Sequence, residues 1–177
     1  MRCVKSLGFV ALVLGLGLSV ASIAADRDQP IRIQANSATL DDRNNTAIYT
    51  GDVIITQGSM QLTGNRVTLN TDAEGAVSKI VSQGAPATYK QTPEGGAPVD
   101  ARGQTIEYLA DVERVVLIDK AFLEQEGNTF KGEYISYDIA REVVDAGRAS
   151  NGGATGAQQD RIEILIQPRK RSEPTPP

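Results

Sequence analysis

The stretch YTGDVIITQGSMQLTGNRVTLN, residues Tyr49–Asn70, alternates apolar and polar side chains. The alternation stops at Gln57-Gly58-Ser59 and again at Gly64-Asn65, and it restarts after each break. A period of two that is interrupted by Gly and Asn is typical of half-buried antiparallel strands joined by tight turns. This stretch therefore predicts a β module with one apolar face.

The same pattern recurs downstream in IDKAFLEQEGNTFKGEYISYD, residues Ile118–Asp138. A shift of 68 positions brings Gln57 onto Gln125 and Gly64 onto Gly132, and it keeps the apolar phase. Internal repetition of this kind predicts that one β module is present twice in the chain. The alternative is that two unrelated amphipathic hairpins happen to look alike.

The first 24 residues have the features of a secretory signal peptide. Arg2 and Lys5 are followed by the apolar run Leu7–Val20, and small residues precede a cleavage site that we predict after Ala24. The apolar run is short for a membrane span, so a retained anchor is the less favoured reading. We expect a single domain at 25–167 and a disordered tail at 168–177, which has little apolar surface to bury.

The composition of the exported chain limits its chemistry. Cys3 leaves with the signal peptide, and no His, Trp or other Cys remains. Disulfides, thiolate or imidazole catalysis and soft-metal sites are therefore excluded, and we expect neither cofactor nor metal. Without Arg2 and Lys5 the 18 basic residues become 16 against 22 acidic ones, a net charge of −6, which offers no basic field for nucleic acid.

The acidic residues do not predict an active site, because most of them fall in expected turns. These are Asp41, Asp42, Asp72, Glu74, Glu94, Asp111 and Glu113. Asp119 is the exception, because the alternation places it on the inward face of its strand. It is either a buried acid or a group near a strand end that pairs with Lys120 or Arg114. The sequence contains no phosphate loop, calcium loop or recognisable carboxylate pair. We predict a protein that is not an enzyme, with a carbohydrate-active enzyme as the least favoured alternative.

The remaining chain predicts an all-β fold of short strands, because no helical periodicity occurs outside the signal peptide. Lys79–Val81 and Ala87–Gln91 are predicted as separate strands around a bend at Gly84-Ala85-Pro86, and Arg161–Gln167 as the last strand. Gly147–Gln159 is glycine-rich and is expected to be mobile. Short strands at this spacing form a sandwich, a barrel or a rolled sheet.

The inward phase of these strands is mostly aliphatic, and no helix is available to fill a rolled sheet. The interior is therefore either an ordinary core or an apolar groove that suits acyl chains. At ~0.8 kcal/mol per buried methylene, a chain of about twelve carbons would contribute on the order of ten kcal/mol before ordering costs. The inward set is Ile31, Ile33, Leu40, Tyr49, Val53, Ile55, Met60, Leu62, Val67, Leu69, Tyr89, Ile106, Tyr108, Val115, Leu117, Ala121, Leu123, Phe130, Ile135, Tyr137, Val144, Ile162, Ile164 and Ile166.

Four segments of the sequence resemble one protein family. They are DQPIRIQAN at 28–36, YTGDVIITQGSMQLTGNRVTL at 49–69, GAPATYKQ at 84–91 and FKGEYISY at 130–137. Together they are similar to the LptA or OstA-like periplasmic lipopolysaccharide-transport family. The resemblance extends to about Gln167, although the glycine-rich stretch and the tail depart from the family pattern.

The resemblance implies a V-shaped β-jellyroll of about sixteen short antiparallel strands in the periplasm of a Gram-negative bacterium. It implies a bridge that carries lipopolysaccharide in outer membrane biogenesis. The inner-membrane Lpt complex would bind at the N-terminal edge (Ile31, Arg32, Ile33), and the outer-membrane translocon at the C-terminal edge (Ile162, Ile164, Ile166). Subunits would stack head to tail by strand addition between these edges.

The resemblance also implies lipid contacts at Ile31, Ile33, Tyr89, Tyr108 and Ala110. The predicted lipid-binding groove takes most of the inward set and adds Ala110. Its members are Ile31, Ile33, Tyr49, Val53, Ile55, Met60, Leu62, Val67, Leu69, Tyr89, Ile106, Tyr108, Ala110, Val115, Leu117, Leu123, Phe130, Ile135 and Tyr137. The alternative function is a non-lipid-binding periplasmic assembly module that acts by edge-strand addition. An open, continuous interior would favour lipid carriage, whereas a sealed and densely packed interior would favour the assembly module.

Overall fold

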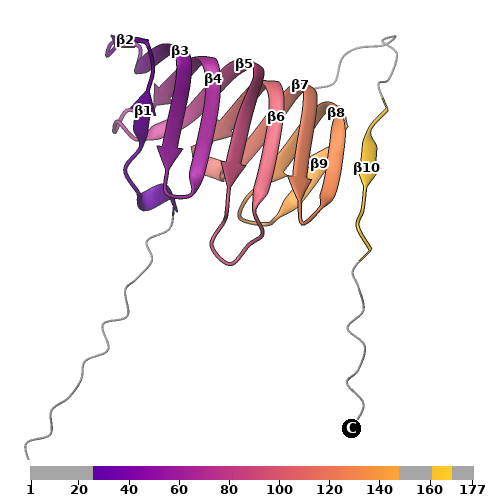
Figure 1. The fold of residues 1–177 in the computed structure, drawn as a ribbon. Helices are drawn as coiled ribbons and strands as arrows, with labels where there is room; N and C mark the ends of the chain where they lie inside the picture. Colours follow the sequence, from indigo (N-terminus) through magenta and orange to yellow (C-terminus); the bar gives the residue numbers. More distant parts are fainter. Residues whose placement is uncertain (1–25, 148–160, 169–177) are drawn as a thin grey trace, which may run out of the picture.

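The computed structural model describes residues 26–147 and 161–168, so the predicted signal peptide and most of the glycine-rich stretch lie outside the described residues. The described chain consists of β-strands and two short 3-10 helices (Figure 1). In chain order the elements are η1 (Asp26–Asp28), β1 (Arg32–Gln34), β2 (Ser37–Asp41), β3 (Thr46–Gln57), β4 (Met60–Thr71), β5 (Val77–Gln91), β6 (Val99–Leu109), η2 (Ala110–Val112), β7 (Arg114–Gln125), β8 (Asn128–Asp138), β9 (Val143–Ala146) and β10 (Glu163–Leu165).

All pairings between these strands are antiparallel, which confirms the predicted all-β class. The strand order is β1-β3-β4-β5-β6-β7-β8-β10, with β2 on the free edge of β3 and β9 on the free edge of β8. Strands β3 to β8 thus follow one another as a meander. The N-terminal strands lie at one end of the sheet and the C-terminal strands at the other (Figure 1).

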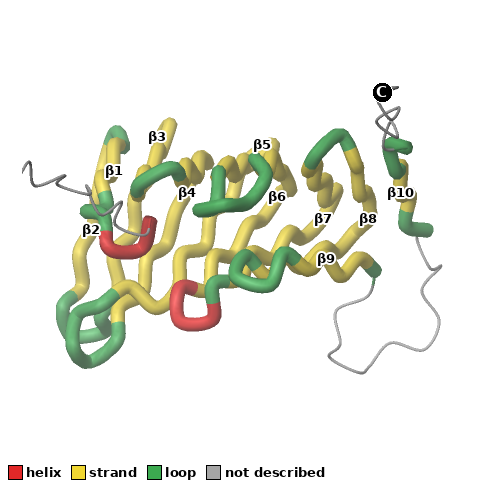
Figure 2. The backbone as a smooth tube through the Cα atoms, turned by 90° about the horizontal axis from the view of Figure 1, so that it is seen from below, coloured by secondary structure: helices red, strands yellow, loops and turns green. Residues whose placement is uncertain are grey.

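The long strands change register near their middles, for example between Thr50 and Val53 in β3 and between Gln83 and Ala87 in β5. These bulges bend the sheet and divide it into two layers, as Figures 1 and 2 show. We call them arm A and arm B. Arm A contains β2, β9 and residues 46–50, 66–70, 77–83, 105–109, 114–118 and 134–138; arm B contains β1, β10 and residues 53–57, 60–63, 87–91, 99–103, 121–125 and 128–132.

The strand number differs from the predicted sixteen, because ten strands are present in the described residues and six of them run through both arms. Gly84-Ala85-Pro86 is a bulge within the continuous strand β5, not a turn between two strands. A proline is tolerated there because a bulge needs no ladder hydrogen bond from it. The last strand covers Glu163–Leu165 and is shorter than the predicted Arg161–Gln167.

The predicted repeat is confirmed. Strands β3 and β7 have bounds that differ by the same 68 positions, and the β3 bulge at Thr50/Val53 recurs in β7 at Ile118/Ala121. The residues inside both bulges have left-handed backbone, at Gly51-Asp52 and at Asp119-Lys120. This geometry interrupts the alternation, so the predicted inward orientation of Asp119 is wrong and its side chain is exposed.

Paired residues on neighbouring strands point to the same face, so the inward side chains form rows that cross the whole sheet. One row lies in arm B: Ile33, Ile55, Leu62, Tyr89, Ala101, Leu123, Phe130 and Ile164. Two lie in arm A: Ala38, Tyr49, Val67, Ser82, Ile106, Leu117, Ile135 and Ala146; and Leu40, Ala47, Leu69, Ile80, Tyr108, Val115, Tyr137 and Val144. The core lies between the arms where these rows face each other.

Candidate functional site: the apolar interior and its mouth

The structure brings the whole predicted groove set into one hydrophobic cluster. Fourteen of its members are buried: Val53, Ile55, Met60, Leu62, Val67, Leu69, Tyr89, Ile106, Tyr108, Val115, Leu117, Leu123, Ile135 and Tyr137. The other five, Ile31, Ile33, Tyr49, Ala110 and Phe130, are partly buried and pack against them. Ala110 lies in η2, directly after β6. Whether these residues contact lipid stays a prediction.

Sequence reasoning missed five buried members of this cluster, namely Ala47, Ile80, Ala87, Val99 and Ala101. Ile80 lies in the predicted strand Lys79–Val81, but three residues were too few to assign a phase. Val99 follows the loop Thr92–Pro98 directly, and alanine carries little signal at any position. Ala47, Ile80 and Ala101 lie in the inward rows, where their pairing partners identify them. Ala87 and Val99 lie outside these rows and are identified by their burial alone.

The interior between the arms is closed in this structure. Ile55, Leu62, Tyr89, Leu117 and Leu123 all have 0% exposure. Among the described residues, no buried side-chain nitrogen or oxygen lacks a hydrogen-bond partner. The packing is therefore that of a filled core, and not of an open channel.

The apolar rows become accessible toward the two ends of the sheet. At the first end Ile33 and Tyr49 are half-buried, and Leu40, although in the inward row, is 67% exposed because β2 is the terminal strand. At the other end Phe130 is half-buried, and Ile164 of β10 is 46% exposed. The inward face thus extends beyond the sealed core in both directions.

A mouth lies between the arms on the side opposite the bulges, where the turns of both arms approach each other. One cavity there, of about 380 Å³, is lined by the β5–β6 loop and by the β8–β9 turn. A second, of about 340 Å³, is lined by the chain before β1 and by η2. Arg27, Gln57 and Tyr108 line both cavities.

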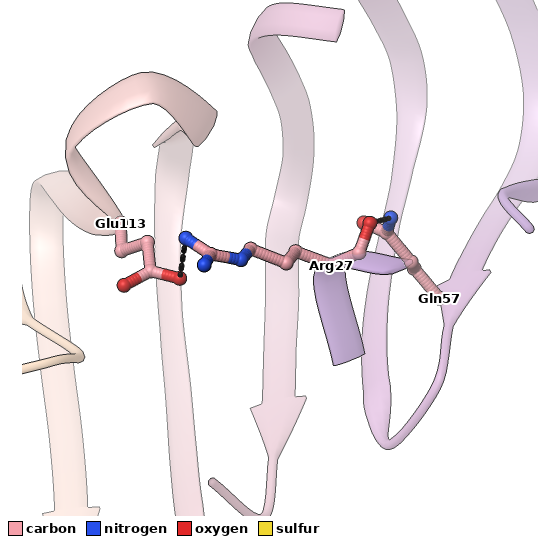
Figure 3. Close-up of polar contacts among 3 residues, drawn as sticks. All are labelled: Arg27, Gln57 and Glu113. Atoms are coloured by element: carbon pink, nitrogen blue, oxygen red, sulfur yellow. Dashed lines mark hydrogen bonds and ion pairs between the residues drawn. The ribbon is translucent and has the colours of Figure 1, made fainter. Parts of the chain in front are cut away.

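The segment η1 lies at this mouth and is tied to arm B; we call Asp26–Asp28 the N-terminal strap. The Gln57 side-chain amide donates to the backbone carbonyl oxygens of Arg27 (2.9 Å) and Gln29 (3.1 Å). The Asp26 carboxylate accepts from the Ser59 backbone N–H (2.8 Å), from the Ser59 hydroxyl and from the Gln91 amide (2.9 Å). Toward arm A the Arg27 guanidinium reaches the Glu113 carboxylate, with 3.5 Å between Nη1 and Oε1 (Figure 3).

The pKa values of several groups at the mouth and in the core are shifted, but not toward neutral pH. Desolvation raises the pKa of Asp26, but its hydrogen bonds with Gln91 and Ser59 outweigh this effect, so its pKa lies below the ordinary value. Burial raises the pKa of Tyr89, Tyr108 and Tyr137 above that of a free tyrosine. These phenols are therefore neutral at physiological pH. The Tyr89 hydroxyl donates to the Gln91 side-chain oxygen, and the Tyr137 hydroxyl accepts from the Gln125 amide (3.4 Å).

Two of the acidic turn residues accept hydrogen bonds from backbone N–H groups of their own turns. Asp41 accepts hydrogen bonds from the backbone N–H groups of Arg43 and Asn44, and Asp72 accepts from those of Glu74 and Ala76. Residues 26–147 and 161–168 contain no cluster of three or more potential metal ligands. In the same residues no helix has the length and apolar character that would let it cross a membrane.

The predicted partner edges lie at opposite ends of the sheet. Strand β1 pairs with β3 on one side, and β10 pairs with β8 on one side. Ile162, Ile164 and Ile166 are 43%, 46% and 73% exposed. Sequence reasoning missed β2 as part of the N-terminal edge, although all five of its residues are exposed. Binding of a partner at either edge stays a prediction.

Comparisons with known proteins bear on this architecture. Residues 32–143 match the family described as LptA/(LptD N-terminal domain) LPS transport protein. The chain is 48% identical to the lipopolysaccharide export system protein LptH of Pseudomonas aeruginosa over 98% of this chain and 100% of the relative. It is 33% identical to the export system protein LptA of Escherichia coli K12 over 76% of each chain.

A solved structure agrees with these sequence comparisons. The crystal structure of Pseudomonas aeruginosa LptH, described as the LptA homologous periplasmic component of the lipopolysaccharide transport device, superposes with a TM-score of 0.73. It is 49% identical in sequence and covers 82% of this chain and 100% of that chain.

Proposed function

The chain belongs to the LptA/LptD N-terminal domain family of lipopolysaccharide transport proteins, and on that premise we propose that it is a periplasmic bridge that holds lipopolysaccharide acyl chains between its two arms. Members of this family are transport proteins and not enzymes. The sequence comparison and the superposed structure both concern a periplasmic export component.

One observation carries the proposal: the inward apolar rows run across every long strand and continue to the end strands, where Leu40 and Ile164 are exposed. Rows that ended in polar side chains at the terminal strands would offer no apolar surface to a neighbouring subunit. Rows that stay apolar to both ends instead provide a surface that a neighbouring subunit can extend. Acyl chains would lie along these rows, and phosphates and sugars would stay at the rim of the arms or outside.

The sealed interior requires that the arms separate before a lipid enters. The two layers are joined by the bulged bends, while at the mouth they meet through turns and the strap. Separation at the mouth would therefore expose the inward rows without breaking the strand pairing. The gain from burying acyl methylenes, about 0.8 kcal/mol each, would offset the lost contacts between the arms.

In the proposed bridge the two sheet edges contact different partners. Ile31, Arg32 and Ile33 would face the inner-membrane Lpt complex, and the β10 edge would face the outer-membrane translocon or the next copy of this chain. An exposed strand edge can accept another strand through its free backbone groups, which gives a physical basis for head-to-tail stacking.

The test compares two aspartate substitutions on β1. Ile33 points inward and is half-buried, whereas its neighbour Gln34 is exposed on the other face. We expect Ile33→Asp to reduce the lipopolysaccharide that co-purifies with the protein, and Gln34→Asp, which adds the same charge, to leave it unchanged. Circular dichroism checks that both variants keep the β fold. Leu117 is unsuitable for this test, since it is fully buried and a charge there would unfold the domain.

Photo-crosslinking gives an independent measurement. A photoreactive residue at position 33 or 130, the half-buried inward positions at the two ends, is expected to capture lipopolysaccharide during export. If neither position captures it while the variants remain folded, lipid carriage between the arms is refuted.

The alternative function, an assembly module that adds strands to partners and binds no lipid, is favoured by the filled interior. The two functions predict different amounts of lipid bound to the purified protein. Lipid analysis of protein isolated from a lipopolysaccharide-containing source should find bound lipopolysaccharide if the chain is a carrier. A lipid-free protein that still associates through its sheet edges would establish the assembly module.

A further inference from the structure

We propose that the N-terminal strap is a latch on the mouth: it is fixed to arm B, it is fastened to arm A through the Arg27–Glu113 ion pair, and its release controls the entry of lipid. This inference rests on the proposed lipid carriage and assigns control of the same site to named residues. It follows from the unequal attachment of the strap to the two arms.

The attachment to arm B is extensive. Gln57 and Gln91 belong to the end of arm B that borders the mouth, and Ser59 lies in the β3–β4 turn that joins two of its strands. Together they make four hydrogen bonds to Asp26 and Arg27 of the strap and one to Gln29, which follows it. Gln57 and Gln91 are 9% and 8% exposed, and the three bonds that their amides donate are partly buried, whereas the two bonds from Ser59 are exposed. A side chain at Gly58 would collide with Asp26, which shows how closely the strap lies against the β3–β4 turn.

The attachment to arm A is slight. Within the described residues, one ion pair joins the strap to arm A, with 3.5 Å between Arg27 and Glu113. The two side chains are 68% and 33% exposed. Exposed pairs of this kind contribute little to stability, and salt weakens them further. The strap can therefore detach from arm A while it remains bound to arm B.

The position of the ion pair fits a latch. Arg27 lines both cavities of the mouth, together with Gln57 and Tyr108, so the strap lies where the two cavities meet. Glu113 follows η2 and has left-handed backbone (φ 47°), and its carboxylate reaches the Arg27 guanidinium. Farther along the mouth, the Glu142 carboxylate lies beside Gly96, so the turns of the two arms also approach each other there.

The first experiment measures the distance across the mouth in protein that carries no lipid. Spin labels at positions 94 and 140, both exposed and lining the mouth from opposite arms, can be introduced as cysteines because Cys3 is the sole native cysteine. We expect Arg27→Ala to lengthen and broaden the distance between the labels. The combined reversal Arg27→Glu with Glu113→Arg is expected to restore the wild-type distance.

The matched control is Arg141→Ala. Arg141 also lines the mouth and is 73% exposed, but its ion pair with Asp138 (3.9 Å) lies within arm A. Its loss removes the same charge from the mouth without releasing the strap, so we expect no change in the label distance. A distance that changes equally in Arg141→Ala, or that does not change in Arg27→Ala, overturns the latch.

The second experiment measures the uptake of fluorescent lipopolysaccharide by the purified chain. We expect Arg27→Ala to load about two- to fivefold faster than wild type, which is the range that a weak exposed ion pair allows. Arg141→Ala should load at the wild-type rate, and the charge reversal should return loading toward it. Slower loading in Arg27→Ala would indicate that Arg27 binds the anionic head group and would overturn the latch. If wild type takes up no lipopolysaccharide, the proposed carriage fails, whereas the label distances still decide whether the strap closes the mouth.

Discussion

Individual side chains in the inward rows differ in how much they stabilise the fold, and two leucines show the contrast. Leu62 lies in the middle of the arm B row with 0% exposure, whereas Leu40 lies at the end of an arm A row with 67% exposure. We expect Leu62→Ala to lower the free energy of unfolding by about 2–5 kcal/mol, since it leaves a cavity in a packed core.

The matched substitution Leu40→Ala should change that free energy by less than about 0.5 kcal/mol, because the side chain is already in water. Equilibrium unfolding in urea measures both values. A large loss at Leu40 in dilute protein would show that its row is covered within a single chain, contrary to the structure.

The three buried tyrosines predict how stability depends on alkaline pH. Burial raises the pKa of Tyr89, Tyr108 and Tyr137, so each phenol keeps its proton in the folded chain at a pH where the unfolded chain has lost it. Their stabilising contribution is complete below the unfolded pKa of 10.0 and is lost as pH rises through the folded values. Thermal unfolding temperatures should therefore fall above about pH 10, and tyrosinate absorbance should rise together with unfolding. Ionisation of all five tyrosines in the folded protein near pH 10 would contradict this prediction.

At the scale of single elements, the bulges decide the architecture, and the β3 bulge depends on a glycine. Gly51 has φ +82°, and a Cβ there would lie 2.5 Å from the Asn36 side-chain nitrogen. Gly75, in the β4–β5 turn, has nearly the same φ (+85°) but no atom within 4 Å of such a Cβ. The two positions thus separate backbone strain from a steric clash.

We expect Gly75→Ala to cost about 1 kcal/mol from left-handed backbone alone, and Gly51→Ala to cost about 1–2 kcal/mol more because Asn36 must move. Chemical denaturation of the two variants tests the difference. Equal losses would mean that Asn36 adjusts freely and that the bulge does not depend on close contact with Gly51.

The elements also show how far the sequence predicts this fold. Alternation and the repeat predict the pairing strands and the inward phase, because each long strand has one buried face. The bulges could not be distinguished from turns, since Gly84-Ala85-Pro86 has the composition of a turn wherever it occurs. Asp119 was predicted to point inward because the alternation of apolar and polar residues passes through it in the sequence. In the structure Asp119 and Lys120 both have left-handed backbone, and this interrupts the alternation. The strap was not predicted, since Asp26 and Arg27 acquire their roles from partners more than thirty residues away.

At the scale of the whole molecule, the two ends of the sheet are unlike each other, which is what head-to-tail stacking requires. The first end consists of β1 and β2, and the last end consists of β9 and β10. A contact between unlike ends is heterologous, so it cannot form a two-fold symmetric dimer and instead produces a row of copies, or a ring where the rotation closes. The inward rows of one copy would then continue in the next, which joins the proposed stacking to the proposed carriage.

Strand β10 permits a test of stacking that spares the core. All three of its residues are exposed, and β10 is held to β8 by a short ladder and by the exposed Lys131–Glu163 ion pair. We expect removal of residues 161–177 to leave a folded chain that self-associates much more weakly, because the C-terminal edge is lost. Removal of residues 169–177 alone keeps β10 and should preserve self-association. Sedimentation velocity over a range of concentrations measures both variants, with circular dichroism as the check on folding. Equal association in the two truncations would show that copies stack through another surface, and the β10 edge would then have to be abandoned as the partner site.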